Sequence, residues 1–262
     1  MLKENVALIT GAASAKGIGF GIAKKFAENG CHLVLNDVRE LDEPALGTLR
    51  ELEGSGIRWL FAKADVSDAA QVKSLVQAAL DVFGRIDVLV NNAAVAPLPK
   101  SVADIPVEEW EKVLAVNLKG PFLLTREVGP HMARRGSGRI INISATSGLM
   151  PAIMDAHYNS AKAGLIMLTK DTALEFAPAN VTVNCICPGV IVTGLTETVV
   201  PPGVEPWAFF EGLTKRIVPM KRPGTPEDVA KAALFFASEL GSYVTGEALL
   251  VAGGAPLTRL TP

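Results

Sequence analysis

The sequence contains few cysteines and histidines, and it has no long apolar run. Its three cysteines, Cys31, Cys185 and Cys187, are too few for a disulfide framework and lack the paired spacing of a zinc site. The three histidines are scattered, and no two form a ligand pair at helical spacing. No uninterrupted apolar stretch reaches the ~18 residues that cross a bilayer. We therefore expect neither a metal site nor a membrane span.

A large excess of charge of one sign is also absent. The chain has 25 basic and 27 acidic residues, with a formal net charge of -2. This balance argues against general binding to nucleic acid. The chain starts with MLKENVALIT, which lacks the basic region, apolar core and cleavage site of a secretory signal. We therefore expect a cytoplasmic protein without a nucleic-acid or membrane partner.

Short apolar runs typical of buried strands recur along the 262 residues. They lie at Val6–Thr10, His32–Asn36, Trp59–Ala64, Val88–Asn91, Ile140–Ser144, Val181–Ile186 and Ala248–Val251. Segments with helical spacing separate them, at Gly17–Asn29, Ala69–Phe83, Val107–Arg135, Tyr158–Phe176 and Glu227–Leu240. This alternation predicts a single α/β domain over residues 1–262. We expect a Rossmann-type doubly wound parallel sheet of about seven strands, with helices on both faces.

One segment, at about residues 193–222, does not fit another strand-helix unit. It combines several prolines with Trp207, Phe209 and Phe210. Such a composition favours an excursion over the carboxyl edge of the sheet, where it would form a substrate lid. A surface helix that packs its aromatic side chains on the core or on another subunit explains the composition equally well.

The first predicted strand opens into TGAASAKGIG, which leads directly into an apolar helix. Glycines at such a turn let the backbone approach a pyrophosphate, and the helix start offers unpaired N–H groups and the positive end of its dipole. We therefore predict that a dinucleotide contacts Gly11, Lys16, Gly17, Ile18 and Gly19.

The second predicted strand runs into Asp37, about 26 residues after Gly11. A carboxylate at this place can accept hydrogen bonds from an adenosine ribose, which favours NAD. Lys16 and Arg39 could instead attract the 2'-phosphate of NADP. Because Asp37 would repel that phosphate, we expect NAD, with NADP as the alternative.

Tyr158 and Lys162 are four residues apart in a segment with helical spacing, so their side chains share one helix face. A free phenol has a pKa of ~10 and is a poor base at neutral pH. A nearby ammonium stabilises the phenolate and lowers that pKa. The pair therefore predicts an acid/base site.

With these two features, the sequence resembles the classical short-chain dehydrogenase/reductases. The resemblance rests on TGAASAKGIG, NNAA at residues 91–94, VLAVNLKG, YNSAK and PGVIVT, with a closing GEALLVAGG. These motifs stand in the family's order and spacing over nearly the whole chain. The resemblance implies a Rossmann-type fold and an oxidoreductase that uses a nicotinamide dinucleotide.

The resemblance also implies individual roles. Tyr158 would be the acid/base, and Lys162 would lower its pKa and hold the nicotinamide ribose. Asn117 would anchor a water in a proton relay. Further cofactor contacts would lie beside the adenine, at Asp65 and Val66, and along the cofactor, at Asn91 and Ala93. The contacts around the carboxamide would be Pro188, Ile191 and Thr193.

Two departures from the family pattern concern the site. The glycine turn holds two extra residues between Gly11 and Gly17. In NISATSG, Ala145 stands where the family usually has its substrate-polarising serine. Three explanations are open. Ser144 is displaced into the pocket, or the hydroxyl of Thr146 or Ser147 takes the role of the usual serine. The third is that the chain is a variant whose catalytic serine has been removed. We predict Ser144, which requires the strand to end or bulge there.

These observations predict an NAD-dependent oxidoreductase that moves a hydride between nicotinamide and a small secondary alcohol or ketone. An NADPH-dependent ketone or 3-oxoacyl reductase is the alternative among enzymes. A catalytically silent NAD-binding or sensor protein is the alternative from another class, suggested by Ala145. The resemblance implies a homotetramer, or less often a homodimer, with the helices near residues 107–135 and 158–176 at an interface.

Overall fold

The structure is a computed structural model that describes residues 1–255. The strands are β1 (Val6–Thr10), β2 (His32–Asp37), β3 (Trp59–Lys63), β4 (Val88–Asn91), β5 (Gly138–Ile143), β6 (Val181–Pro188) and β7 (Ala248–Val251). The α-helices are α1 (Ile18–Ala27), α2 (Glu43–Gly54), α3 (Ala69–Phe83), α4 (Val107–Leu114), α5 (Gly120–Arg135), α6 (Ala156–Phe176), α7 (Pro206–Ile217) and α8 (Pro226–Ala237).

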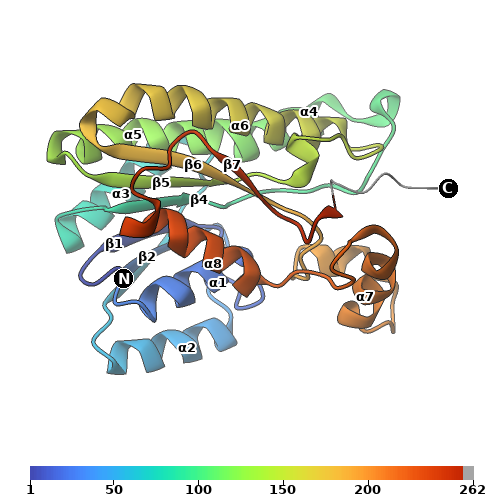
Figure 1. Ribbon diagram of the computed structural model, residues 1–262, viewed down its shortest axis with the longest axis horizontal. Helices are drawn as coiled ribbons and strands as arrows, with labels where there is room; N and C mark the ends of the chain where they lie inside the picture. Colours follow the sequence, from blue (N-terminus) through green and yellow to red (C-terminus); the bar gives the residue numbers. More distant parts are fainter. Residues whose placement is uncertain (256–262) are drawn as a thin grey trace.

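The seven strands form one parallel sheet in the order β3-β2-β1-β4-β5-β6-β7. Helices α3, α5 and α6 cover one face, while α1 and α8 cover the other, with α2 beyond them (Figure 1). The strand order reverses between β1 and β4, and ligands of open α/β sheets bind at such a switch point. The predicted fold class is therefore confirmed.

The sheet separates two apolar cores, and this explains why its strands read as continuous apolar runs. All residues of β1, β2, β4, β5 and β6 are buried. One core lies between the sheet and α1, α2 and α8, with Phe26 and Phe236 among its largest side chains. The other lies between the sheet and α3 and α5, with Val128 and Met132 at its centre. The strands are thus covered on both faces, as parallel sheets require.

Several features of the fold differ from the sequence-based expectation, including a strand end, a helix interruption and an unpredicted helix. Strand β5 ends at Ile143, one residue before Ser144. The predicted helix over residues 107–135 is interrupted by a π-helical turn at Ala115–Lys119. Helix α2 was not predicted, because it buries only Ala45 and Leu49 and so shows little apolar periodicity. Its start is nevertheless marked by Asp42, whose side chain accepts the Ala45 N–H.

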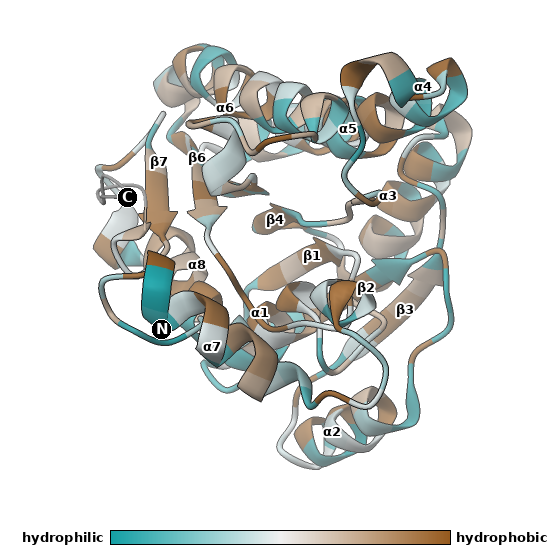
Figure 2. Ribbon diagram, turned by 90° about the vertical axis from the view of Figure 1, so that its right-hand side faces the viewer, coloured by the Kyte–Doolittle hydropathy of each residue, from teal (hydrophilic) through white to brown (hydrophobic). Residues whose placement is uncertain are grey.

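The segment at residues 193–222 leaves the body of the molecule and carries α7, which stands apart from the sheet in Figure 1 and faces the viewer in Figure 2. Phe210 is buried and meets Phe209 edge to face, whereas Trp207 remains partly exposed. A helix with a buried aromatic residue is compatible with both interpretations of this segment, the substrate lid and the packed surface helix. Its role as a lid stays a prediction. Within residues 1–255, no helix is long and apolar enough to cross a membrane.

Candidate active site

The carboxyl ends of the parallel strands meet at one edge of the sheet, here called the carboxyl edge. There β1 leads into Gly11, β2 ends at Asp37 and β4 ends at Asn91. Strand β5 ends just before the 145–148 turn, which packs against α6, the helix of Tyr158 and Lys162. The fold therefore brings the predicted dinucleotide turn and the predicted acid/base helix to the same edge.

The turn after β1 has no room for side chains at two of its glycines. Gly11 has a φ of +65°, and a Cβ there would lie 2.8 Å from the Ala93 Cα. A Cβ at Gly19 would lie 2.5 Å from the Gly11 carbonyl oxygen and 2.6 Å from Asn92 Nδ2. Asn92 also donates to the carbonyls of Thr10 (2.8 Å) and Gly11 (3.0 Å). Asn92 therefore holds the turn in place, a role that the motif NNAA could have suggested but that we did not predict.

The start of α1 offers the amide groups that an anion needs. Gly17 is the N-cap, and no side chain caps the helix. The N–H groups at Ile18 and Gly19 therefore lack an intrahelical acceptor and stand at the positive end of the helix dipole. This arrangement suits a pyrophosphate.

Asp42 orders the two extra residues of the turn. Its carboxylate accepts the Ser14 hydroxyl (2.8 Å) and the Ala15 N–H (3.1 Å), and it also caps α2 through the Ala45 N–H (2.9 Å). The insertion is thus tied to the next helix. Gly11 and Gly19 keep their close backbone contacts in this longer turn.

The charged groups near the expected adenosine site are paired. Asp37 accepts the N–H groups of Ala13 (3.1 Å) and Arg39 (3.1 Å). The Arg39 side chain approaches the same carboxylate at 3.4 Å. The Lys16 ammonium lies 3.0 Å from Glu197, which belongs to the 193–222 segment. Both cations that could bind a 2'-phosphate therefore have carboxylate partners.

Asn91 is buried inside the sheet. Its amide donates to Asn142 Oδ1 (2.8 Å), and the Asn142 amide donates to Thr169 (2.8 Å), so the side chains form a ladder beneath the site. The Asn91 Oδ1 atom has no hydrogen-bond partner within the described residues, and the contact of this residue with a cofactor stays a prediction. The neighbouring Ala93 donates its N–H to the Thr10 hydroxyl (3.0 Å) at the rim of the turn.

Asn117 sits in the π-helical turn and is fully buried. Its side chain accepts the Val95 N–H (2.8 Å) and donates to the Val95 carbonyl (2.9 Å). The Asn117 side chain is therefore held inside the protein and does not face solvent. π-Turns often occur at functional sites, and here the turn anchors the loop that follows β4.

Tyr158 and Lys162 lie near the start of α6, as predicted. The Lys162 Nζ is 5.4 Å from the centre of the Tyr158 ring and donates to the Ile143 carbonyl (2.8 Å). Lys162 is buried. Its ammonium therefore occupies the space between the end of β5 and the tyrosine.

The pKa values at this pair differ from the sequence-based expectation. Burial raises the pKa of Tyr158 to about 12, and the nearby Asp155 carboxylate adds to that rise. Burial lowers the pKa of Lys162 to about 8. In this structure the pKa of the phenol is therefore raised, because burial removes the water that would stabilise the phenolate. At neutral pH, Tyr158 keeps its proton.

The prediction that Ser144 supplies the polarising hydroxyl does not fit its geometry. The strand ends before Ser144, as that prediction required, but the hydroxyl donates to the Lys162 carbonyl (2.8 Å) and the residue is buried. A hydroxyl has one proton, and this one is committed to helix α6. Ser144 therefore links β5 to α6. By contrast, the Ser147 hydroxyl is buried and has no hydrogen-bond partner within the described residues.

The remaining predicted cofactor residues lie at the ends of β3 and β6. Val66 is buried against Gly120, where a Cβ would come within 2.9 Å of its side chain. Asp65 accepts the Ser67 N–H (2.8 Å). The others lie at the end of β6 or just after it, at Pro188, Ile191 and Thr193.

Comparisons with known proteins find similar chains over nearly the whole length. A family model described as "Enoyl-(Acyl carrier protein) reductase" matches residues 11–256. "Dehydrogenase/reductase SDR family member 4" of Bos taurus is 39% identical over 255 residues, which cover 97% of this chain and 88% of the relative. "NAD-dependent glycerol dehydrogenase" of Listeria innocua is 35% identical over 254 residues, which cover 97% and 94%.

A solved structure described as levodione reductase has a similar fold. Its TM-score is 0.89 at 29% sequence identity, and the match covers 99% of this chain and 100% of that one. The similarity therefore extends over the sheet, the glycine turn and the helix that carries Tyr158.

Proposed function

The chain belongs to the classical short-chain dehydrogenase/reductases, an oxidoreductase family, and we propose that it transfers a hydride between NAD and a secondary alcohol or ketone. The observation that carries this proposal is the place of Tyr158 and Lys162 at the same sheet edge as the glycine turn. An assay of nicotinamide absorbance with a panel of alcohols and ketones tests it. Absence of turnover with every compound and both dinucleotides would contradict it.

The residues present fit a dinucleotide. The turn at Gly11 and Gly19 admits only backbone, and the uncapped start of α1 directs free N–H groups outward. We assign the pyrophosphate to this turn and the adenosine ribose to Asp37. The bound nicotinamide would accept or supply the hydride at its C4 atom.

We favour NAD over NADP. A 2'-phosphate would meet the Asp37 carboxylate, while Lys16 and Arg39 are already paired with carboxylates. The name of the Listeria innocua relative also states NAD dependence. Measured KM values should therefore be lower for NAD than for NADP. A lower KM for NADP would instead favour a ketone or 3-oxoacyl reductase.

Tyr158 handles the proton in this proposal. With a pKa of about 12, the phenol is protonated at neutral pH and can donate to a ketone oxygen as the hydride arrives. In the opposite direction, the phenol must first lose its proton. We therefore expect alcohol oxidation to accelerate as the pH rises from 7 to 10, with a much smaller change for ketone reduction. Parallel pH profiles in both directions would argue against Tyr158 as the acid/base.

Ala145 is the feature that favours a second candidate, a catalytically silent dinucleotide-binding protein. We propose that the enzyme is active and that Ser147, whose buried hydroxyl has no partner, polarises the substrate oxygen in place of a serine at residue 145. Loss of one such donor costs ~3 kcal/mol of transition-state stabilisation. Ser147→Ala should then lower kcat about a hundredfold. A contrary result would be a kcat about a hundredfold higher in Ala145→Ser together with no effect of Ser147→Ala. The parent chain would then have no hydroxyl that polarises the substrate oxygen.

The rim of the site favours an apolar or cyclic substrate. Large apolar side chains are exposed in the two segments that follow β4 and β5, at Leu98, Leu149, Met150, Ile153 and Met154. Exposed apolar patches often mark ligand sites. Preference for small charged substrates in the panel would contradict this proposal.

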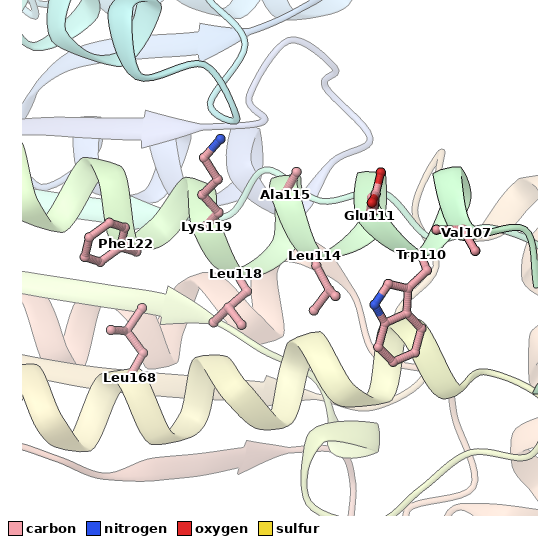
Figure 3. Close-up of a pocket in the computed structure, with 9 residues that line it drawn as sticks. All are labelled: Val107, Trp110, Glu111, Leu114, Ala115, Leu118, Lys119, Phe122 and Leu168. Carbon is pink, nitrogen blue, oxygen red and sulfur yellow. The ribbon is translucent and has the colours of Figure 1, made fainter.

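We further propose that two copies of the chain associate through α4, α5 and α6, within a homotetramer. An apolar groove runs along these helices, where the side chains of Trp110, Leu114 and Leu118 point toward α6, the helix that carries Leu168 (Figure 3). Trp110 and Phe122 are exposed in a single chain, which suits an interface. Light scattering should show that Phe122→Asp reduces the oligomer mass, whereas Val82→Asp on the exposed face of α3 does not.

We place this activity in the cytoplasm. The three cysteines are free and buried, which is common in reducing compartments. Fractionation of cells that produce the native protein would test the assignment.

A further inference from the structure

The residue before the tyrosine, His157, has no part in the proposed chemistry, although it is fully buried beside Tyr158. Both of its ring nitrogens have polar neighbours. Nδ1 accepts the backbone N–H of Tyr158 (3.0 Å), and Nε2 lies 3.2 Å from the Glu109 carboxylate. A buried, doubly contacted imidazole next to the acid/base residue suggests a positioning role.

The Tyr158 N–H needs such an acceptor. Helix α6 begins at Ala156, so this N–H is among the first four of the helix, which have no intrahelical acceptor. The N-cap residue Asp155 makes no side-chain cap. The carbonyl of Met154, four residues before Tyr158, accepts the Lys100 N–H (2.6 Å). The His157 ring therefore replaces the usual cap at the turn that carries the tyrosine.

These contacts define the orientation of the ring. Nδ1 faces the Tyr158 backbone N–H, and Nε2 faces the Glu109 carboxylate. Three charged groups face the imidazole or its partner: the carboxylates of Glu109 and Asp155 (3.5 Å from Nδ1), and the Lys100 ammonium beyond Glu109. The arrangement keeps the ring in one orientation.

The same contacts reach the loop between β4 and α4. Lys100 lies in this loop, and its ammonium is 2.6 Å from the second oxygen of Glu109. The loop's other end is held at Val95 by Asn117. Residues 95–100 are thus attached at one end to the π-turn and at the other end, through Glu109 and His157, to the start of α6.

We propose that His157 is a positioning residue, which holds the Tyr158 backbone through Nδ1 and couples it through Glu109 to the 95–100 loop on the substrate side. The proposal rests on the proposed function, because it assigns His157 a part in the same proton transfer. Misplacement of a catalytic group by ~1 Å can reduce a rate about a hundredfold. Loss of the Nδ1 acceptor should therefore lower kcat more than it weakens cofactor binding.

Three substitutions separate the two contacts of the ring. The side-chain oxygen of asparagine takes nearly the place of Nδ1 and can accept the Tyr158 N–H, but it cannot reach Glu109. Glutamine can reach Glu109 but offers no acceptor at Nδ1. His157→Ala and His157→Gln should lower kcat about 30-fold or more, with the KM for NAD within about threefold. His157→Asn should recover kcat to within about fivefold of the parent. His131→Ala, on α5, is the matched control and should leave kcat unchanged.

An amide measurement gives a readout that does not depend on activity. The chain has two tyrosines, so protein labelled with [¹⁵N]tyrosine gives two backbone amide signals, and Tyr243→Phe assigns them. In the parent, the Tyr158 amide should exchange slowly with solvent. His157→Ala and His157→Gln should speed this exchange at least about tenfold. His157→Asn should restore the protection, and His131→Ala should not change it.

Each result has a clear meaning. Unchanged amide exchange in His157→Ala, or a kcat within twofold of the parent, would overturn the proposal. Equal loss of kcat and unfolding midpoint in His157→Ala and His157→Asn would overturn it too, because His157 would then only fill space. If the parent shows no turnover with any alcohol or ketone, the proposed function fails. The amide exchange of the variants would in that case still decide whether His157 holds Tyr158. If His157→Ala does not fold, the contrast between His157→Asn and His157→Gln decides the outcome.

Discussion

Both edges of the sheet carry buried ionisable groups. The fold favours the charged form at one edge and opposes it at the other. At the amino edge, where the strands begin, Asp87 accepts the Val6 N–H (2.9 Å) and pairs with Arg85 (2.6 Å) and Arg135. Burial alone would raise the pKa of Asp87, but these partners outweigh it and hold the pKa below its usual value. The fold thus stabilises the charged form of this group.

At the carboxyl edge the balance is reversed. Lys162 is buried without a carboxylate partner, and its lowered pKa of about 8 means that the fold opposes its charge. Tyr158 has a raised pKa because the fold opposes the phenolate. Groups that are incompletely compensated reduce stability and remain available for chemistry. We infer that the amino edge serves stability and the carboxyl edge serves the reaction.

The largest expected effect is a loss of activity at the carboxyl edge with almost no loss of stability. Tyr158→Phe removes one hydroxyl and should lower kcat about a thousandfold, because the proton transfer loses its acid/base. The free energy of unfolding should change by less than about 1 kcal/mol, since the ring remains. Single-turnover kinetics and urea denaturation measure the two quantities. Equal turnover in parent and variant would show that another group moves the proton.

The opposite separation is expected at the amino edge. Asp87→Asn leaves two arginines without their carboxylate and should lower the free energy of unfolding by roughly 3 kcal/mol at pH 7. Turnover below the melting range should stay within about twofold, since the residue lies at the far end of the strands. Chemical denaturation and kcat provide the comparison.

The pH dependence supplies the control for that substitution. The pKa of Asp87 is lowered in the fold, so its stabilisation is complete above the unfolded pKa of ~3.9 and is lost as the pH falls through the folded value. Parent and Asp87→Asn should therefore converge in stability once the pH lies below the folded pKa of Asp87. A difference that persists in acid would mean that packing, and not charge, accounts for the loss.

A gain in stability is expected when the unpaired ammonium is removed. The pKa of Lys162 falls from 10.5 to about 8 on folding, which costs about 3 kcal/mol at neutral pH. Lys162→Met removes that cost but leaves the Ile143 carbonyl without its donor. We expect the free energy of unfolding to rise by about 2 kcal/mol at pH 7 while activity is lost. Denaturation curves at several pH values measure the change.

The sign of this effect can be followed with pH. Because the folded pKa is depressed, the parent becomes more stable as the pH rises from about 8 to 10.5, and the advantage of Lys162→Met should disappear over the same interval. A variant that is less stable than the parent at pH 7 would show that the lysine contributes to the fold, contrary to the comparison of the two edges.

The sequence predicted the elements of the carboxyl edge better than their contacts. Buried parallel strands read as apolar runs, and the order of TGAASAKGIG and YNSAK placed the turn and the acid/base pair correctly. The direction of a hydroxyl is not contained in such patterns. Ser144 follows the strand end, and its hydroxyl donates to the Lys162 carbonyl of α6, a long-range contact that the sequence does not reveal.

The sequence analysis also did not predict the side chains that act by bonding to backbone atoms. Asn92 and Asp42 hold the glycine turn, and His157 caps the tyrosine, but each does so through atoms brought together by folding. The pKa of Tyr158 shifts opposite to the expected direction for a related reason. Spacing on a helix indicates which groups are neighbours, but it does not reveal how much water reaches them.

The smallest expected effect concerns an ion pair at the carboxyl edge that is exposed. Lys16 of the glycine turn and Glu197 of the 193–222 segment lie 3.0 Å apart, and the lysine side chain is 67% exposed. Exposed pairs contribute ~0.5 kcal/mol, so Glu197→Gln should leave stability unchanged within error. The variant frees Lys16, however, and the freed ammonium can attract a 2'-phosphate. We expect the ratio of KM values, NADP over NAD, to fall about two- to threefold at low salt, and the shift to fade at 0.5 M salt. A shift in the KM ratio that persists at high salt would place Lys16 in a buried contact with the cofactor. The contrast between buried ion pairs at the amino edge and an exposed ion pair at the carboxyl edge would then not hold for Lys16.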